Sequence, residues 1–228
     1  MIKKLISFFK AAVYPNRCLA CGRLIDSCGV CRGCEAVFNR VPASSCPMCG
    51  EAANMCECWR FKIKTNGFVA PFFNVGRVQK AFYNFKFAEK KSGAEYFGLA
   101  MANAFKSRLG NIEADVICFV PNTHDSRRHY PPRLLAEVLS RELKLPLAPD
   151  MLCKVKGNLP QHTLDFKSRV DNVKGIYAAN GSLEGKIIVL VDDIRTTGAT
   201  MNECAKVLKK AGAKEVYGVS ALKSRNLK

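Results

Sequence analysis

The segment Val189-Leu-Val-Asp192-Asp193-Ile-Arg-Thr196-Thr197-Gly198-Ala199-Thr200 decides the fold that we expect for this chain. The apolar run that leads into it is typical of a strand buried on both faces of a parallel sheet. The residues that follow it have the periodicity of a helix. Asp192 and Asp193 therefore stand where a strand ends, and Gly198 stands where a helix begins. Open parallel sheets bind their ligands at such junctions.

The chemistry of this junction favours a sugar phosphate. A helix N-terminus offers unpaired backbone N–H groups and the positive end of the helix dipole. With the hydroxyls of Thr196, Thr197 and Thr200, these amides are suited to enclose a phosphate, and Gly198 lets the backbone approach it. The two adjacent acids suit the 2′ and 3′ hydroxyls of a ribose, or a magnesium ion. The alternative is an ordinary helix start with a capping box between Thr200 and Glu203, which leaves the acids unexplained.

Apolar patterns on both sides of the junction extend it into an α/β domain. The final strand is expected to close the sheet, with helices covering both faces. In chain order, the expected elements are a strand at 68–75, helices at 77–87 and 93–109, a strand at 115–120, a helix at 133–144, a strand at 186–192, a helix at 200–211 and a strand at 216–222.

The composition is that of a basic globular protein. Its 228 residues carry a formal charge of +17, which favours polyanionic partners, and the 48% of hydrophobic residues exclude a disordered basic tail. No stretch approaches the roughly 20 apolar residues that a membrane-spanning helix needs, and the start of the chain lacks a cleavable leader pattern. We therefore expect a cytoplasmic protein.

Nine of the twelve cysteines lie between residues 18 and 58 and form a local module. Paired Cys-x2-Cys turns present two sulfurs to one ion, and zinc takes four such ligands in a tetrahedron. Two structural zinc ions are the simplest interpretation. The expected ligand sets are Cys18, Cys21, Cys31 and Cys34 for the first ion, and Cys46, Cys49, Cys56 and Cys58 for the second.

Two alternatives to these ligand sets stay open. Cys28 is left as a spare thiol, although Cys28-x2-Cys31 is itself a competing pair. The module is also compatible with disulfide-bonded loops, which a reducing compartment disfavours. The three remaining cysteines are expected to be ordinary core thiols.

The change in composition near residue 66 predicts two domains. Residues 1–66 form a small N-terminal zinc-binding domain, similar to a double zinc ribbon, and residues 67–228 form the α/β domain. Residues 2–13 have the pattern of a short amphipathic basic helix. We expect its apolar face to pack on the protein, and the alternative is that it lies on the inner face of the membrane.

Together these motifs resemble a known family. The Asp-Asp-x-x-Thr-Thr-Gly loop, the paired cysteine knuckles and the Phe85-Lys86-Phe87 helix end are similar to those of the ComF family of competence-associated proteins, which includes ComFC and GntX-like members and has the type I phosphoribosyltransferase fold. The same resemblance extends to the stretch Pro160-Gln161-x2-Leu164-x4-Arg169-x2-Asn172-Val173-x-Gly175-Ile176-Tyr177.

The resemblance implies a binding site for phosphoribosyl pyrophosphate with magnesium. Asp192 and Asp193 would hold the ribose, and residues 196–200 would hold the 5′-phosphate. The pyrophosphate loop and the hood above the site would contribute Pro121, Asn122, Thr123 and His124, Arg127 and Arg128, and Gln161 and Arg169. Many relatives carry Arg-Gly-Phe-Asn-Gln after the pyrophosphate loop, where this chain has the shorter run from Arg127 to Arg133. Turnover and binding without turnover are both compatible with that departure.

The resemblance also implies a role in DNA uptake and natural transformation, with contacts to single-stranded DNA and to proteins of the uptake machinery. The high positive charge supports the contact with DNA. Two other functions stay open on the residues alone. One is a non-catalytic, zinc-dependent adaptor that binds nucleic acid, and the other is a salvage phosphoribosyltransferase acting on a nucleobase.

Overall fold

The computed structural model describes residues 16–27, 29–56, 58–60, 63–88, 92–122, 129–155 and 173–225. Some of the expectations above fall on other residues. The amphipathic helix at 2–13, the spare thiol of Cys28 and the candidate ligand residues Thr123, His124, Arg127, Arg128, Gln161 and Arg169 lie outside the described residues.

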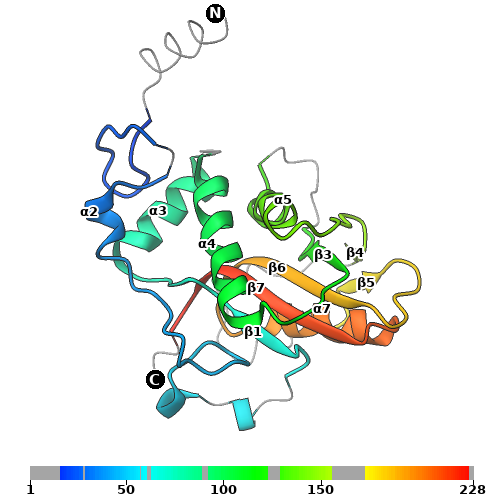
Figure 1. Ribbon diagram of the computed structural model, residues 1–228. Coiled ribbons are helices and arrows are strands. Elements are labelled where there is room, and N and C mark those ends of the chain that lie inside the picture. The colour runs from blue at the N-terminus through cyan, green and yellow to red at the C-terminus, as the bar shows by residue number, and fades with distance from the viewer. Residues whose placement is uncertain are drawn as a thin grey trace, which may run out of the picture.

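A parallel β-sheet forms the centre of the molecule (Figure 1). Its strand order is β1-β7-β6-β3, with the short β2 also paired to β7, and every pairing within it is parallel. The predicted parallel α/β sheet is therefore confirmed. The strands are β1 (Gly67–Val69), β2 (Phe72–Phe73), β3 (Val116–Phe119), β6 (Ile187–Arg195) and β7 (Glu215–Lys223).

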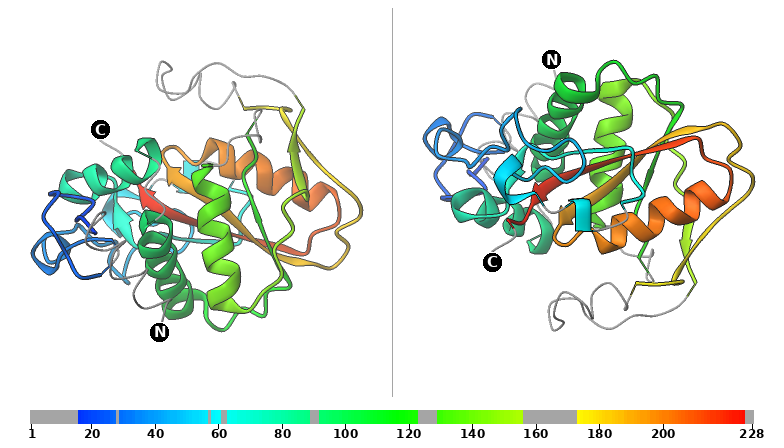
Figure 2. Two further views of the ribbon diagram at one scale, coloured as in Figure 1. Left: turned by 90° about the horizontal axis from the view of Figure 1, so that it is seen from above. Right: turned by 90° about the horizontal axis from the view of Figure 1, so that it is seen from below.

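Helices cover both faces of this sheet, as expected (Figure 2). Three of them, α3 (Gly76–Phe87), α4 (Ser92–Leu109) and α5 (Pro131–Leu143), pack on one face, and α7 (Ala199–Lys210) packs on the other. Side chains of β6 alternate between the two layers, because successive residues of a strand point to opposite faces. Val189 and Val191 join the cluster under α3, α4 and α5, and Ile188 and Leu190 join the one under α7.

The structure corrects three expectations about the strands. The expected strand at 68–75 is divided into β1 and β2 around Pro71, which has no N–H to donate to a ladder. The last strand does not close the sheet, because β7 lies between β6 and β1. The strand expected at 186–192 continues to Arg195, which pairs with Lys223 of β7.

A separate antiparallel ribbon was not expected from the sequence. It consists of β4 (Leu152–Lys154) and β5 (Tyr177–Ala179), which pair with each other outside the main sheet. Tyr177 and Leu152 are buried in the same cluster as α7, so the ribbon is packed onto that side of the domain.

The segment that contains residues 18–58 (the cysteine segment) has little regular structure and packs against the α/β part. It contains one short helix, α2 (Arg32–Glu35), and two 3-10 turns, η1 (Ala53–Met55) and η2 (Cys58–Arg60). The amide of Phe68 in β1 donates to the carbonyl of Pro47 at 2.7 Å, and the Asn84 side chain in α3 donates to the carbonyl of Leu19 at 2.7 Å. Within the described residues, no helix is long and apolar enough to cross a membrane.

Candidate functional site

Two neighbouring strands deliver candidate ligand residues to one edge of the sheet. β3 and β6 are parallel, with Phe119 opposite Val191, and the Val120 amide donates to the carbonyl of Val191 at 2.9 Å. The residues that follow β3, Pro121 and Asn122, therefore lie beside Asp192 of β6. The Tyr130 hydroxyl donates to the Val120 carbonyl at 2.6 Å and holds this exit in place.

The two acids of β6 are oriented by the backbone and by a lysine from a distant helix. An oxygen of Asp192 accepts the N–H of Asp193 at 2.8 Å, and an oxygen of Asp193 accepts the N–H of Ile194 at 2.6 Å. Lys86, near the end of α3, forms an ion pair with Asp193 in which Nζ lies 2.6 Å from Oδ2. The Asp193 side chain is only 15% exposed, so this cation is its counter-charge in a poorly solvated place.

Burial and charge perturb the ionisation of these groups. Burial raises the pKa of Asp192 well above its ordinary value, and the charge of Asp193 adds to this effect. Burial alone would lower the pKa of Lys86, but the charges of Asp193 and Asp192 outweigh it and raise that pKa. Burial also raises the pKa of Tyr177 in β5, with further contributions from Cys204 and Asp192. Tyr177 therefore feels the charge of Asp192 from the antiparallel ribbon.

The sequence did not assign a role to Lys86, and a second unassigned residue holds the same helix end. His129, which comes just before α5, has Nε2 2.8 Å from the carbonyl oxygen of Phe85, and its ring meets the Phe85 ring edge-on at 5.3 Å. Phe82 and Phe85 of α3 are fully buried, and the ion pair with Asp193 places the adjacent Lys86 at the acids of β6.

Gly198 begins the helix that follows the acids. It is the N-cap of α7 with φ 79°, a left-handed conformation that glycine adopts without steric cost. The Ala199 amide donates to Oγ1 of Thr197 at 3.2 Å, which shapes the turn. The alternative capping box is wrong, because Gly198 and not Thr200 is the N-cap. Glu203 instead accepts the N–H of Gly175 at 3.0 Å.

Arg195 lies against this turn from the side of the cysteine segment. Its side chain is buried, with Nη1 donating to the carbonyl of Met48 at 2.9 Å and the guanidinium carbon 4.3 Å from the centroid of the Phe68 ring. A Cβ at Gly198 would lie 2.7 Å from Nε of Arg195, so this position requires glycine for space as well as for φ. Burial lowers the pKa of Arg195, and the sulfur charges of Cys49, Cys58 and Cys46 oppose that effect.

The predicted ligand residues fall into two groups. One group gathers at the carboxyl ends of β3 and β6 and at the start of α7: Pro121, Asn122, Asp192, Asp193, Thr196, Thr197, Gly198, Ala199 and Thr200. The other group, from the pyrophosphate loop after Asn122 and from the hood, lies outside the described residues. The ligand-binding role of both groups stays a prediction.

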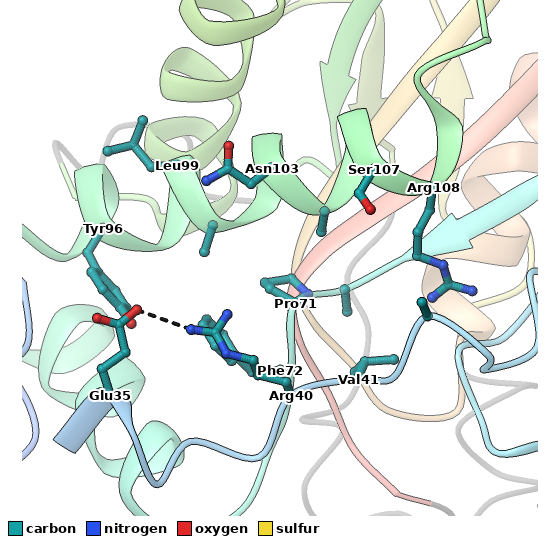
Figure 3. Close-up of a pocket in the computed structure, with 14 residues that line it drawn as sticks. Glu35, Arg40, Val41, Pro71, Phe72, Tyr96, Leu99, Asn103, Ser107 and Arg108 are labelled. Atoms are coloured by element: carbon teal, nitrogen blue, oxygen red, sulfur yellow. Dashed lines mark hydrogen bonds and ion pairs between the residues drawn. The ribbon is translucent and has the colours of Figure 1, made fainter. Parts of the chain in front are cut away.

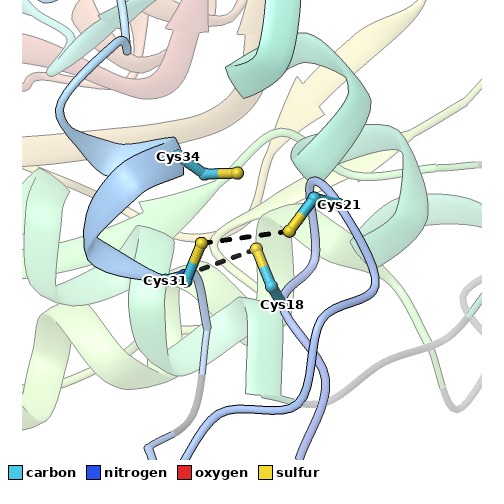
Figure 4. Close-up of side chains that lie close together, drawn as sticks. All are labelled: Cys18, Cys21, Cys31 and Cys34. Atoms are coloured by element: carbon cyan, nitrogen blue, oxygen red, sulfur yellow. Dashed lines mark hydrogen bonds between the residues drawn. The ribbon is translucent and has the colours of Figure 1, made fainter.

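The first cysteine cluster has the geometry of a metal site (Figure 4). The sulfurs of Cys18, Cys21, Cys31 and Cys34 all lie within 4.8 Å of one another, and those of Cys21 and Cys31 are 3.9 Å apart. A tetrahedron with Zn–S bonds of about 2.3 Å has sulfurs about 3.8 Å apart, so the cluster fits zinc.

The second cluster repeats this arrangement. The sulfurs of Cys46, Cys49, Cys56 and Cys58 also lie within 4.8 Å, with Cys46 to Cys58 and Cys49 to Cys56 both at 3.8 Å. These separations are far above the S–S bond length of about 2.05 Å, so these pairs are not disulfides. Two four-cysteine clusters consistent with structural metal sites are therefore present, with the eight expected members.

Both clusters use the same tight turn. In the first, the amide of Gly22 donates to the carbonyl of Cys18 at 2.8 Å, and in the second the amide of Gly50 donates to the carbonyl of Cys46 at 2.8 Å. Each glycine has a positive φ, 77° and 74° respectively. The sequence signal for this turn is the glycine that directly follows Cys21 in the first cluster and Cys49 in the second.

Backbone amides prepare one thiol in each cluster for metal binding. Burial would raise the pKa of Cys18, but N–H groups of Cys31, Cys21 and Ala20 lower it to about 6. In the second cluster, burial is likewise outweighed, chiefly by the amide of Met48, and the pKa of Cys46 falls to about 7. A thiolate is the form that binds metal, so the backbone favours the metal-binding form of one ligand in each cluster.

Each cluster is attached to a different part of the candidate ligand site. Nη1 of Arg77, at the start of α3, lies 3.8 Å from the sulfur of Cys34, so the first cluster contacts the helix that carries Lys86. The second cluster contacts the ends of β6 and β7, through Arg195 and through a buried ion pair between Lys223 and Glu51.

A cavity of about 500 Å³ lies elsewhere, between the cysteine segment, the β1–β2 edge and α4 (Figure 3). Its polar groups include the ion pair between Arg40 and Glu35, together with Asn103 and Ser107 of α4. None of its lining residues belongs to the predicted ligand site or to the two cysteine clusters.

Comparisons with known proteins agree with this architecture. A model of the phosphoribosyl transferase domain matches residues 133–225. Competence protein F of Haemophilus influenzae is 27% identical over 88% of this chain and 93% of that protein. Competence protein ComFC of Bacillus subtilis is 27% identical over 86% of this chain and 84% of that protein. DNA utilization protein YhgH of Escherichia coli is 24% identical over 89% of this chain and 94% of that protein.

Removal of metal is expected to destabilise the protein. The cysteine segment contains little regular structure, so we expect its fold to depend on metal in the two clusters. A loss of only about 3 kcal/mol would lower the melting temperature by roughly 6–12 °C in a chain of this size. Thermal unfolding with and without a zinc chelator measures the change, and added zinc should reverse it. Cys153→Ser, outside both clusters, should leave the zinc content at two per chain. An unchanged melting curve after complete zinc removal would contradict the structural role.

Lys86→Met should reduce stability by about 1–2 kcal/mol at pH 7, because it leaves Asp193 partly buried without its cation. Because the ion pair raises the pKa of Lys86, its contribution should be fully present at pH 7 and should be lost as the pH rises through that raised value. Urea unfolding at pH 7 measures the loss of stability. Lys80→Met is the matched control, since Lys80 is exposed on the same helix. Equal stabilities of the Lys86 and Lys80 variants at pH 7 would exclude a stabilising ion pair.

Proposed function

We propose that the carboxyl end of β6 binds phosphoribosyl pyrophosphate and that the protein acts in DNA uptake or DNA utilisation. This chain belongs to the ComF/ComFC family of competence proteins and carries a phosphoribosyltransferase domain. One observation carries the ligand part of this proposal. Two partly buried acids among the last four residues of β6 are followed within six residues by a helix whose N-cap is a glycine with positive φ.

In this geometry, two kinds of protein group would bind two parts of the ligand. The vicinal hydroxyls of the ribose would donate to the carboxylates of Asp192 and Asp193, which the backbone already orients. The 5′-phosphate would accept from the amides of the first turn of α7 and from the hydroxyls of Thr196 and Thr197. Binding of a diol donor favours the ionised form of a carboxyl, so it offsets the raised pKa of Asp192.

Magnesium is the cation we propose to accompany the ligand. When bound, it would neutralise charge on the pyrophosphate and on the acid pair. The protein itself supplies Lys86, whose charge already faces Asp193 and is available to the ligand when the acid turns to the ribose. The cysteine clusters are proposed to hold zinc in a structural role, because each has four thiol ligands and the sulfur spacing of a tetrahedron.

Single-stranded DNA is the proposed macromolecular partner. The names of the relatives refer to competence and to DNA utilisation, and the chain carries a charge of +17. Five lysines lie on α7 or in the turns next to β6 and β7, and we propose that they form a basic surface. They are Lys186, Lys206, Lys209, Lys210 and Lys214, none of which is buried. Only Lys206 among them forms an ion pair that tethers it, to Glu203, within the part of the chain that the structure describes.

Calorimetric titration with phosphoribosyl pyrophosphate and magnesium tests the ligand. Asp192→Asn and Asp193→Asn each remove a charged acceptor, worth about 1.5–3 kcal/mol per hydrogen bond, so each should weaken binding by roughly 10-fold to 150-fold. Asp150→Asn, at an exposed position before β4, is the control and should bind like the wild type.

Wild-type affinity in the Asp192 and Asp193 variants would sink the proposed site. A parallel assay of pyrophosphate release with a panel of nucleobases separates transfer from binding alone. Release with one base would favour the salvage enzyme, and binding without release would favour a protein that uses the ligand without turnover.

Salt dependence tests the contact with DNA. The logarithm of affinity for a single strand should fall with the logarithm of salt concentration by about 0.7 per phosphate contact. Replacing both Lys209 and Lys210 by Gln should therefore reduce the magnitude of the slope by about 1.4. The control replaces Lys80 and Lys106, exposed on α3 and α4, and removes the same charge from the other face of the sheet. Equal slopes for the two double variants would exclude the α7 surface.

A further inference from the structure

Two buried cations connect the second cysteine cluster to the ends of neighbouring strands. Lys223, at the end of β7, pairs with Glu51, and both side chains are 3% exposed. Arg195, at the end of β6, donates to the carbonyl of Met48, which lies between two cysteines of the cluster. The first connection anchors the cysteine loop to the sheet. The second joins it to the residue that directly precedes the candidate phosphate-binding turn at 196–200.

Arg195 touches the cluster segment and the turn at the same time. Its guanidinium carbon lies 4.3 Å from the centroid of the Phe68 ring, and its Nε occupies the space directly beside Gly198. A side chain enclosed in this way cannot move without disturbing either Met48 or the backbone at Gly198. The position of the turn is therefore tied to the position of the segment between Cys46 and Cys49.

A second contact joins the same two parts. The amide of Lys64, just after the second cluster, donates to Oδ1 of Asn202 at 2.6 Å. The amide of Asn202 in turn donates to the carbonyl of Gly198 at 2.8 Å. The turn is thus held from the cysteine side through Arg195 before the glycine and through Asn202 after it.

Metal binding at the second cluster would also change the electrostatic environment of Arg195. A zinc ion with four thiolates carries a net charge of about −2, and a buried guanidinium is stable only with a counter-charge nearby. Filling the second cluster would therefore stabilise Arg195 where it now lies. The first cluster contacts α3, through Arg77 and through the Asn84 side chain, and does not share Arg195.

We infer that Arg195 is a positioning residue that couples metal occupancy of the second cysteine cluster to phosphate binding by the turn at 196–200. The inference rests on the proposed function, since it takes that turn as the phosphate site. Coupling between two sites is reciprocal. Zinc in the second cluster should tighten phosphate binding, and a bound phosphate should tighten zinc binding in that cluster by the same factor, which we expect to be seen as slower zinc release.

The test measures zinc release and ligand affinity together on the full zinc-loaded chain. Release to a chromogenic chelator is followed with and without saturating ribose 5-phosphate, whose affinity is measured by calorimetry. In the wild type, one of the two zinc ions should leave about 5-fold or more slowly when ribose 5-phosphate is bound. The release of the other ion should be unchanged.

The variants isolate Arg195. Arg195→Met should bind ribose 5-phosphate at least 5-fold more weakly and should release one zinc ion faster, at a rate that the ligand no longer alters. Arg195→Lys keeps the charge and should retain part of the coupling. Arg77→Met, at the first cluster, should leave both ligand affinity and the ligand effect on zinc release as in the wild type. The ion pair between Lys223 and Glu51 remains in every variant and keeps the cysteine loop anchored.

The outcomes separate this inference from the proposed function. Binding of ribose 5-phosphate with no change in zinc release would overturn the coupling and leave the phosphate site standing. A persistent ligand effect on zinc release in Arg195→Met would overturn the role of Arg195. If the wild type does not bind ribose 5-phosphate at all, the inference and the proposed phosphate site both fail.

Discussion

The burial of β6 between two other strands and two helical layers is the constraint on which the site depends. Apolar residues up to Val191 fill both layers, so Asp192 and Asp193 emerge where water is already limited. Acids in such a place need donors and a counter-charge. The backbone supplies donors at Asp193 and Ile194, and α3 supplies Lys86. The result is an acid pair that is oriented before any ligand arrives.

The cysteine segment supports this site as well as itself. Its first cluster contacts the start of α3, the helix that carries Lys86, and its second cluster contacts the residue that precedes the glycine turn. Both connections run through arginines, which bring several donors and a permanent charge. Only the second of these arginines also lies beside the turn that begins α7, since Nε of Arg195 would be 2.7 Å from a Cβ at Gly198.

Sequence patterns predicted those features that depend on neighbours along the chain. The strand before Asp192, the helix after Gly198 and the two cysteine knuckles each consist of consecutive residues, and all are present, although the strand continues to Arg195. Features that depend on how distant segments meet were missed. Nothing along the chain showed that β7 would lie inside the sheet, that Lys86 would reach Asp193 across 107 residues, or that β4 and β5 would pair outside the sheet.

Gly198 and Arg195 show where the sequence alone determined an outcome and where the tertiary structure decided it. The sequence alone determined that the turn needs a glycine, because a positive φ and the start of a helix are local properties. Only the fold decided that the guanidinium of Arg195 would fill the space beside that glycine and reach Met48. Local backbone preferences act over a few residues. The position of a buried charged side chain depends on the distant groups that folding brings within a few ångströms of it.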